Sequence, residues 1–155
     1  MKTAHRRAAN AKRQNQDHLT SWIRVIAGNQ EQPEANATDI TNKVRIAYEL
    51  LKSGQASDGD FDRVASALNV GLVRAELIDP LAEQTMQSGI NAMYSCHDIH
   101  KRHGRYGFTG PDILAVNDAL NLYEDIVRLS TPKMMCDATT VAFRRVSEMA
   151  RGVAV

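Results

Sequence analysis

The sequence has few aromatic residues, two cysteines and no long hydrophobic run. Aromatic residues make up 5% of the 155 positions, so the core must be built mainly from aliphatic side chains, alanine and methionine. Cys96 and Cys136 lie far apart without metal-ligand spacing, which predicts reduced thiols rather than a disulfide framework. No run approaches the ~18 apolar residues of a membrane span, and the basic N-terminus leads into polar sequence without the apolar centre of a signal peptide. We therefore expect a cytoplasmic protein.

Motifs of the common enzyme and nucleotide-binding classes are missing as well. The sequence contains no Walker loop, no dinucleotide fingerprint, no CxxC pair and no nucleophile elbow around a serine. Asp58, Asp60 and Asp62 cluster in SDGDFD, but this string lacks the closing glutamate of a calcium loop, so helix capping is their expected role. We predict a protein that is not an enzyme and that uses no cofactor.

What the sequence does have is helical periodicity along most of its length. Apolar residues recur at steps of three and four, between capping residues and glycines or prolines. No stretch is typical of a strand. The pattern predicts an all-α, single-domain antiparallel bundle of about five to six helices over residues 19–152, preceded by a basic arm at 1–18. The expected helices run from about 19 to 28, from 38 or 39 to about 53, from 57 or 58 past Leu72 with a break at Pro80, from 81 to 104, from 109 past Val127, and from 131 to about 152.

Three further features of the sequence concern a linker, a glycine within a helix and an apolar seam. The polar segment 29–38 contains Pro33 and is the expected flexible linker, and Gly71 is an expected weak point within its helix. The clearest apolar seam can fill the chain's own core or pair two copies, so a homodimer stays open. This seam consists of Ile113, Val116, Leu120, Tyr123 and Val127.

The loop RHGRYGFTGP at 102–111 admits two interpretations. As a structural corner, Gly104 ends one helix, Thr109 caps the next, and the two aromatic rings cover the helix ends. As a binding site, Lys101 and the two arginines would surround those rings, a mixture that suits stacking on bases or anchoring a protein. Helix-end chemistry explains more of the residues, so the corner is favoured. The candidate partner-binding residues are Arg102, Arg105, Tyr106 and Phe108.

The stretch RHGRYGFTGPDILAVNDALNLYEDIVRLSTP resembles a segment of small helical proteins of unknown function that are carried by proteobacterial phages, plasmids and integrated elements. It spans residues 102–132. The resemblance implies a mobile-element setting, and it transfers no functional residue to this chain.

The stretch CHDIHKRHG contains the candidate metal ligands His97, Asp98 and His100. Residues three apart share a helix face, and a divalent metal would need further ligands. The His-Asp pair resembles the central pair of HD-type phosphohydrolases, whose site also requires an upstream histidine and a downstream aspartate. Only His5 and His18 are available upstream, so a solvated histidine-rich helix end is the favoured interpretation.

The basic arm resembles in composition the arginine-rich segments that fold into a helix on RNA. Five cations stand against Asp17 alone in residues 1–18. Binding through them would depend strongly on salt, because cations on phosphates release counterions. The alternative is a frayed N-terminus. The candidate nucleic-acid-binding residues are Lys2, Arg6, Arg7, Lys12, Arg13 and Lys101.

These observations predict a non-enzymatic mobile-element protein that inhibits or regulates a macromolecule of the host or of the element, for example as an anti-CRISPR antagonist of a defence complex. The expected partner is a protein complex rather than a membrane. Two alternatives remain open. One is an RNA- or DNA-binding protein that acts through the arm, and the other is a metal-dependent HD-like phosphohydrolase.

Overall fold

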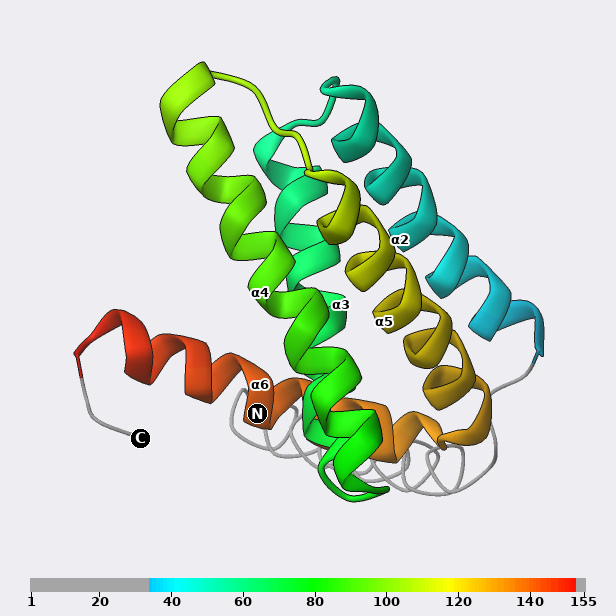
Figure 1. Ribbon diagram of the computed structural model, residues 1–155. Helices are drawn as coiled ribbons and strands as arrows, with labels where there is room; N and C mark the ends of the chain where they lie inside the picture. Colours follow the sequence, from blue (N-terminus) through cyan, green and yellow to red (C-terminus); the bar gives the residue numbers. More distant parts are fainter. Residues whose placement is uncertain (1–33, 153–155) are drawn as a thin grey trace, which may run out of the picture.

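The computed structural model describes residues 34–152, in which five α-helices follow one another through short connections (Figure 1). The helices are α2 (Glu34–Ser53), α3 (Asp58–Ala75), α4 (Pro80–His103), α5 (Gly110–Leu129) and α6 (Pro132–Ala150). This part of the chain contains no strand, so the predicted all-α bundle is confirmed. The basic arm and the predicted helix at 19–27 lie outside the described residues.

Local capping groups set most helix boundaries where the sequence placed them. The Ser57 and Thr109 side chains each cap a helix in a complete capping box with the aspartate three residues later. Thr131 caps α6 ahead of Pro132, and Gly104 ends α4 in the left-handed conformation with φ 72°.

The N-terminal boundary of α2 differs from the prediction. The helix begins at Glu34, so residues 34–38 of the expected linker are helical. Ala37 explains the difference, because its side chain is only 1% exposed and packs in the core. This packing extends the helix into sequence that is polar by composition.

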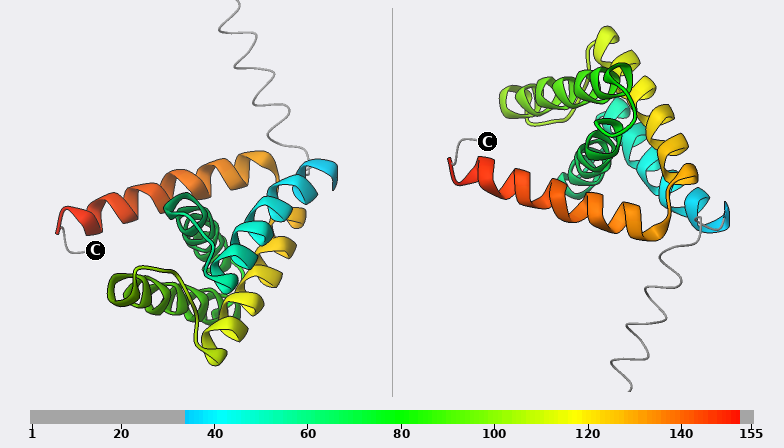
Figure 2. Two further views of the ribbon diagram at one scale, coloured as in Figure 1. Left: turned by 90° about the horizontal axis from the view of Figure 1, so that it is seen from above. Right: turned by 90° about the horizontal axis from the view of Figure 1, so that it is seen from below.

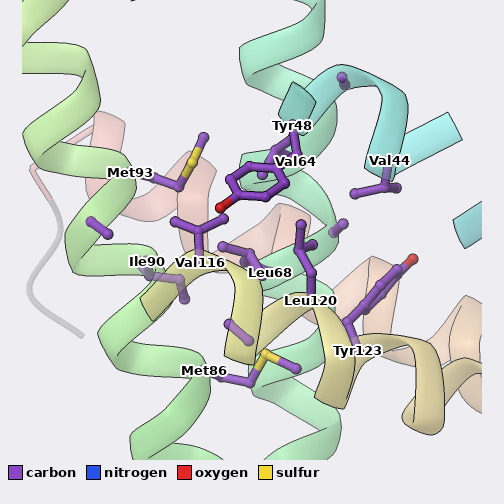
Figure 3. Close-up of a cluster of buried hydrophobic side chains, with 14 of the residues drawn as sticks. Val44, Tyr48, Val64, Leu68, Met86, Ile90, Met93, Val116, Leu120 and Tyr123 are labelled. Carbon is purple, nitrogen blue, oxygen red and sulfur yellow. The ribbon is translucent and has the colours of Figure 1, made fainter. Parts of the chain in front are cut away.

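α3 is the central helix and contacts each of the other four. Figure 2 shows it enclosed by α6, by α4 and by the pair of α2 and α5. Tyr48 reaches from α2 into the centre, where its hydroxyl donates a hydrogen bond of 2.7 Å to the carbonyl oxygen of Ile113. Burial raises the pKa of Tyr48 to about 12, which keeps this donor protonated. The core residues labelled in Figure 3 are Val44, Tyr48, Val64, Leu68, Met86, Ile90, Met93, Val116, Leu120 and Tyr123.

The apolar seam of α5 fills the chain's own core. Val116, Leu120, Tyr123 and Val127 are buried against α2, α3 and α4. Of the two roles that the sequence left open for the seam, the fold uses it to join helices within one chain.

Two glycines allow α4 to approach its neighbours closely. A Cβ atom at Gly89 would lie 2.5 Å from the Cβ of Ala119 on α5, and one at Gly71 would lie 2.8 Å from the Cε of Met86. The sequence predicted a weak point in the helix at Gly71, and the structure does not show one. The helix continues unbroken, and the missing side chain makes room for a buried methionine.

A polar clamp joins α2 to α5. The Arg45 guanidinium donates to Asn117, Asn121 and Glu124, which lie one turn apart on the same face of α5. Arg45, Asn117 and Glu124 are partly buried and Asn121 is exposed. A planar guanidinium can donate to several acceptors at once.

α6 lies crosswise to α3 (Figures 1 and 2). Ala138 and Ala142 pack against Val70 and Val73, and Arg145 forms a bidentate ion pair with Glu76 at 2.7 and 2.9 Å. Val146 and Met149 continue the three- and four-residue spacing of Ala138 and Ala142, which by periodicity alone predicts burial, but they are 48% and 57% exposed. Because the two helices cross, only the first half of the stripe meets α3.

No helix within residues 34–152 combines the length and the apolar character needed to cross a membrane.

Candidate recognition surfaces

The loop at 102–111 is built around a stacked tyrosine. The Tyr106 ring lies between His100, at 4.0 Å between centroids, and Phe61, at 5.1 Å, with interplanar angles of 8° and 14°. Its hydroxyl donates a hydrogen bond of 2.6 Å to Asp58 Oδ1 at the start of α3. Burial, reinforced by this carboxylate, raises the pKa of Tyr106. The side chain is 5% exposed and both ring faces are covered, so it holds the corner together as the structural interpretation predicted.

The other candidate residues of the loop divide between the interior and the surface. Phe108 is half-buried against Tyr48, with 5.8 Å between ring centroids. Lys101, Arg102 and Arg105 are exposed, and the Arg102 side chain donates to the carbonyl oxygen of Asp98. The cations therefore do not frame an open aromatic face of Tyr106. Lys101, Arg102 and Arg105 instead form an exposed group of positive charges beside the loop.

The helix ends of this corner give a stability prediction. We expect Gly104→Ala and Thr109→Ala each to lower the free energy of unfolding by about 1 kcal/mol, because one forces alanine into a left-handed conformation and the other removes a capping oxygen. Arg105→Ala should change it by less than about 0.5 kcal/mol, since its side chain is exposed. Urea denaturation measures all three, and equal losses would contradict the division between cap and surface.

The three candidate metal ligands point to different neighbours. His97 packs on the Phe61 ring at 5.6 Å, while Asp98 lies 3.9 Å from the Lys101 ammonium. His100 stacks on Tyr106, and its Nε2 lies 3.9 Å from Asp58 Oδ1. Among residues 34–152, no three His, Cys, Asp or Glu side chains are placed to hold a metal ion together. His5 and His18, the upstream histidines considered for a phosphohydrolase, lie outside these residues.

The two cysteines are both free thiols in different surroundings. Cys96 is buried in the core and Cys136 is exposed on α6. Burial raises the pKa of the Cys96 thiol, which favours the protonated and less reactive form. Cys96 therefore serves as a core residue.

An apolar groove of about 590 Å³ opens between α4 and α6, with α3 as its floor. We call it the α4–α6 groove. The two helices stand on either side of α3 in Figure 2. Asp62 is the charged residue among those that line the groove. The apolar lining comprises Phe61, Ala65, Val70, Ile90, Met93, Tyr94, Ala142, Phe143, Val146 and Met149.

Four of these apolar side chains are largely open to solvent. Tyr94 is 56% exposed and Phe143 is 75% exposed, in addition to Val146 and Met149. On α6, the exposed residues recur at steps of three, which aligns them along the groove. Tyr94 and Phe143 could not be identified from the sequence, because an apolar helix face has the same periodicity whether it meets a core or a groove.

A second groove, of about 470 Å³, lies on the other side of α6. We call it the α2–α6 groove. It is lined by Ile40, Lys43 and Val44 of α2, by Arg63 and Val70 of α3, and by Tyr123, Val127 and Met135, among others. It shares Ser66, Val70 and Thr139 with the first groove, so the two flank the line along which α6 crosses α3.

Of the residues predicted to bind nucleic acid, the structure describes Lys101. Lys101 is exposed at the end of α4 and is 3.9 Å from Asp98. The remaining candidates, Lys2, Arg6, Arg7, Lys12 and Arg13, lie in the chain before residue 34.

Comparison of the chain with protein-family models, curated proteins and solved structures finds no match.

Proposed function

We propose that this chain is a non-enzymatic binding protein that holds an amphipathic helix of a partner protein in the α4–α6 groove. The observation that carries the proposal is the exposure of Tyr94, Phe143, Val146 and Met149 around an apolar floor. Large apolar side chains that gather on a surface and face a hollow are typical of recognition sites rather than of ordinary solvent-exposed surface.

The shape of the groove favours a helix as the ligand. Two helices form its walls and a third forms its floor, which is the arrangement that accepts the apolar face of an amphipathic helix. The α6 residues that line it extend from Thr139 to Met149, about 15 Å along the axis and therefore about three turns. Methionine side chains in the lining adapt to the shape of an inserted side chain, and the rigid aromatic rings offer it a large apolar contact area.

The charge of the groove adds one requirement for the partner. Asp62 lies in the lining and is exposed, and no cationic side chain is among the lining residues. A partner helix with a lysine or arginine next to its apolar anchors would place that cation near the carboxylate. We therefore expect an amphipathic helix that carries basic residues on one flank.

In the cell, we propose that this binding inhibits or regulates a protein complex of the bacterial host or of a mobile element, in the cytoplasm. The resemblance of residues 102–132 to proteins of phages, plasmids and integrated elements supports the setting. Antagonism of a defence complex, as by an anti-CRISPR protein, is the most specific form of this proposal. A small binding protein can act in this way by occupying a helix that the complex needs for assembly.

Affinity purification from a bacterial host with two matched variants tests the groove. Phe143→Glu places a charge on the wall of the groove, and Leu114→Glu places the same charge on α5 at a residue that is 65% exposed and outside the lining. We expect Phe143→Glu to weaken partner binding at least about tenfold, as loss of a central apolar anchor does. Leu114→Glu should bind as the unmodified chain does. Equal recovery with both variants, or no partner with any of them, would contradict the proposal.

A further inference from the structure

The α2–α6 groove exposes an apolar border of the core. Its floor includes Val44, Tyr123 and Val127 from the main core and Val70 from the smaller cluster beneath α6. Met135 packs against both clusters, and Ile40 at the edge of the groove is 38% exposed. The hollow thus lies where two parts of the core meet, and an apolar element laid in it would cover both.

Residues 19–26 of the same chain have the sequence of an amphipathic helix. Leu19, Trp22, Ile23 and Ile26 fall on one face of a helix, while Ser21 and Arg24 fall on the opposite face. A helix this short is marginal in water without a tertiary contact. We propose that residues 19–26 dock as a helix in the α2–α6 groove, with Trp22 and its apolar neighbours covering Ile40, Val70 and Met135.

The connection to α2 is long enough for this docking. Residues 27–33 precede Glu34, and seven residues span at most about 25 Å when extended. Ile40 lies six residues into α2, about 9 Å along its axis from Glu34. A segment that folds back from the start of α2 therefore reaches the groove without strain.

Segment 19–26 can reach the α2–α6 groove more directly than the α4–α6 groove. The first turns of α2 and α6 lie at the same corner of the molecule (Figure 2). The α2–α6 groove lies close to this corner, since Ile40 of α2 and Met135 of α6 line it. To reach the α4–α6 groove, the chain would have to pass around α6 to the other side of α3.

Charges at the groove are compatible with this orientation. Lys43 and Arg63 are among the lining residues, and they pair with Asp39 at 2.8 Å and Asp60 at 3.8 Å. Arg24 is the charged residue of segment 19–26, and it lies opposite the apolar stripe. It would therefore point to solvent rather than toward these two cations.

Tryptophan fluorescence of the full chain tests the docking, because Trp22 is its single tryptophan. We expect emission at shorter wavelength and severalfold weaker acrylamide quenching than in a peptide of residues 12–33. Ile40→Glu should return both properties toward those of the peptide. Ile46→Glu is the matched control, because Ile46 lies on α2, is 61% exposed and does not line the groove. Circular dichroism would verify that both variants keep the helical fold, and Ile40→Ser offers a milder change.

Three results would overturn the inference. The first is peptide-like emission of Trp22 in the full chain, and the second is shielding that Ile40→Glu and Ile46→Glu affect equally. The third is shielding that disappears on dilution together with a dimer mass, which would assign the groove to the segment of a second copy. Because the readout does not involve the partner, the inference can fail while the α4–α6 groove still binds one.

Discussion

Gly89→Ala is expected to lower the free energy of unfolding by about 1–3 kcal/mol, the usual cost of inserting a methyl group into a filled core. The new Cβ would lie 2.5 Å from the Cβ of Ala119 and 3.3 Å from a methyl group of Leu68. The Ala119 Cβ is fixed to the backbone of α5, so the helices themselves must move apart. In an open helix position the same change would stabilise by about 1 kcal/mol, so the sign of the effect identifies the close contact.

Two further variants make this measurement specific. Gly110→Ala is the control, because a Cβ at the start of α5 would meet nothing within 4 Å. Ala119→Gly removes the opposing methyl group, so combining it with Gly89→Ala should recover most of the loss in a double-mutant cycle. Urea denaturation measures each stability. A stabilising effect of Gly89→Ala would show that α4 and α5 do not pack as closely as the structure indicates.

Tyr106→Ala is expected to lower the free energy of unfolding by about 3 kcal/mol, as removal of a buried aromatic ring does. The ring joins three parts of the chain, since it stacks on His100 of α4 and Phe61 of α3 and hydrogen-bonds Asp58. Tyr106→Phe keeps both stacking contacts and should lower the free energy of unfolding by only about 1 kcal/mol, because it loses one hydrogen bond.

Tyr94→Ala is the matched control for this experiment, because Tyr94 is 56% exposed on α4 and its removal should change stability by less than about 0.5 kcal/mol. Thermal or urea unfolding of the three variants compares them directly. If Tyr106→Ala were as stable as the unmodified chain, the ring would not be holding the corner, and its role as a partner-binding residue would be favoured instead.

Features that depend on nearby residues could be predicted from the sequence. The capping boxes at Ser57 and Thr109 use an aspartate three positions later, and the left-handed end at Gly104 is a property of glycine itself. The buried seam of α5 follows from spacing along one helix. Each of these signals is complete within a few turns of chain, which is why no knowledge of the tertiary fold was needed.

Features that depend on how helices cross could not be predicted in this way. The stripe on α6 has one period throughout, yet Ala142 is buried and Met149 is 57% exposed because the helix crosses α3 rather than running beside it. A glycine within a helix, such as Gly71, is by sequence a helix defect. Only the position of Met86 in the fold shows that the missing side chain allows a close contact between α3 and α4.

The candidate surfaces show the same limit. The sequence identified Tyr106, but its stacking on His100 and Phe61 depends on the return of α4 past α3. The α4–α6 groove takes its walls from residues more than forty positions apart, such as Met93 and Phe143, and no local pattern links them.

Site-specific photo-cross-linking in a bacterial host measures most directly whether the α4–α6 groove is the recognition surface. A photoreactive phenylalanine analogue would be placed at position 143 in one sample and at position 114, on α5, in another. We predict an adduct with a partner protein from position 143, at an apolar face of one of its helices, and none from position 114. Adducts from position 114 alone, or equal adducts from both positions, would contradict the assignment of the groove.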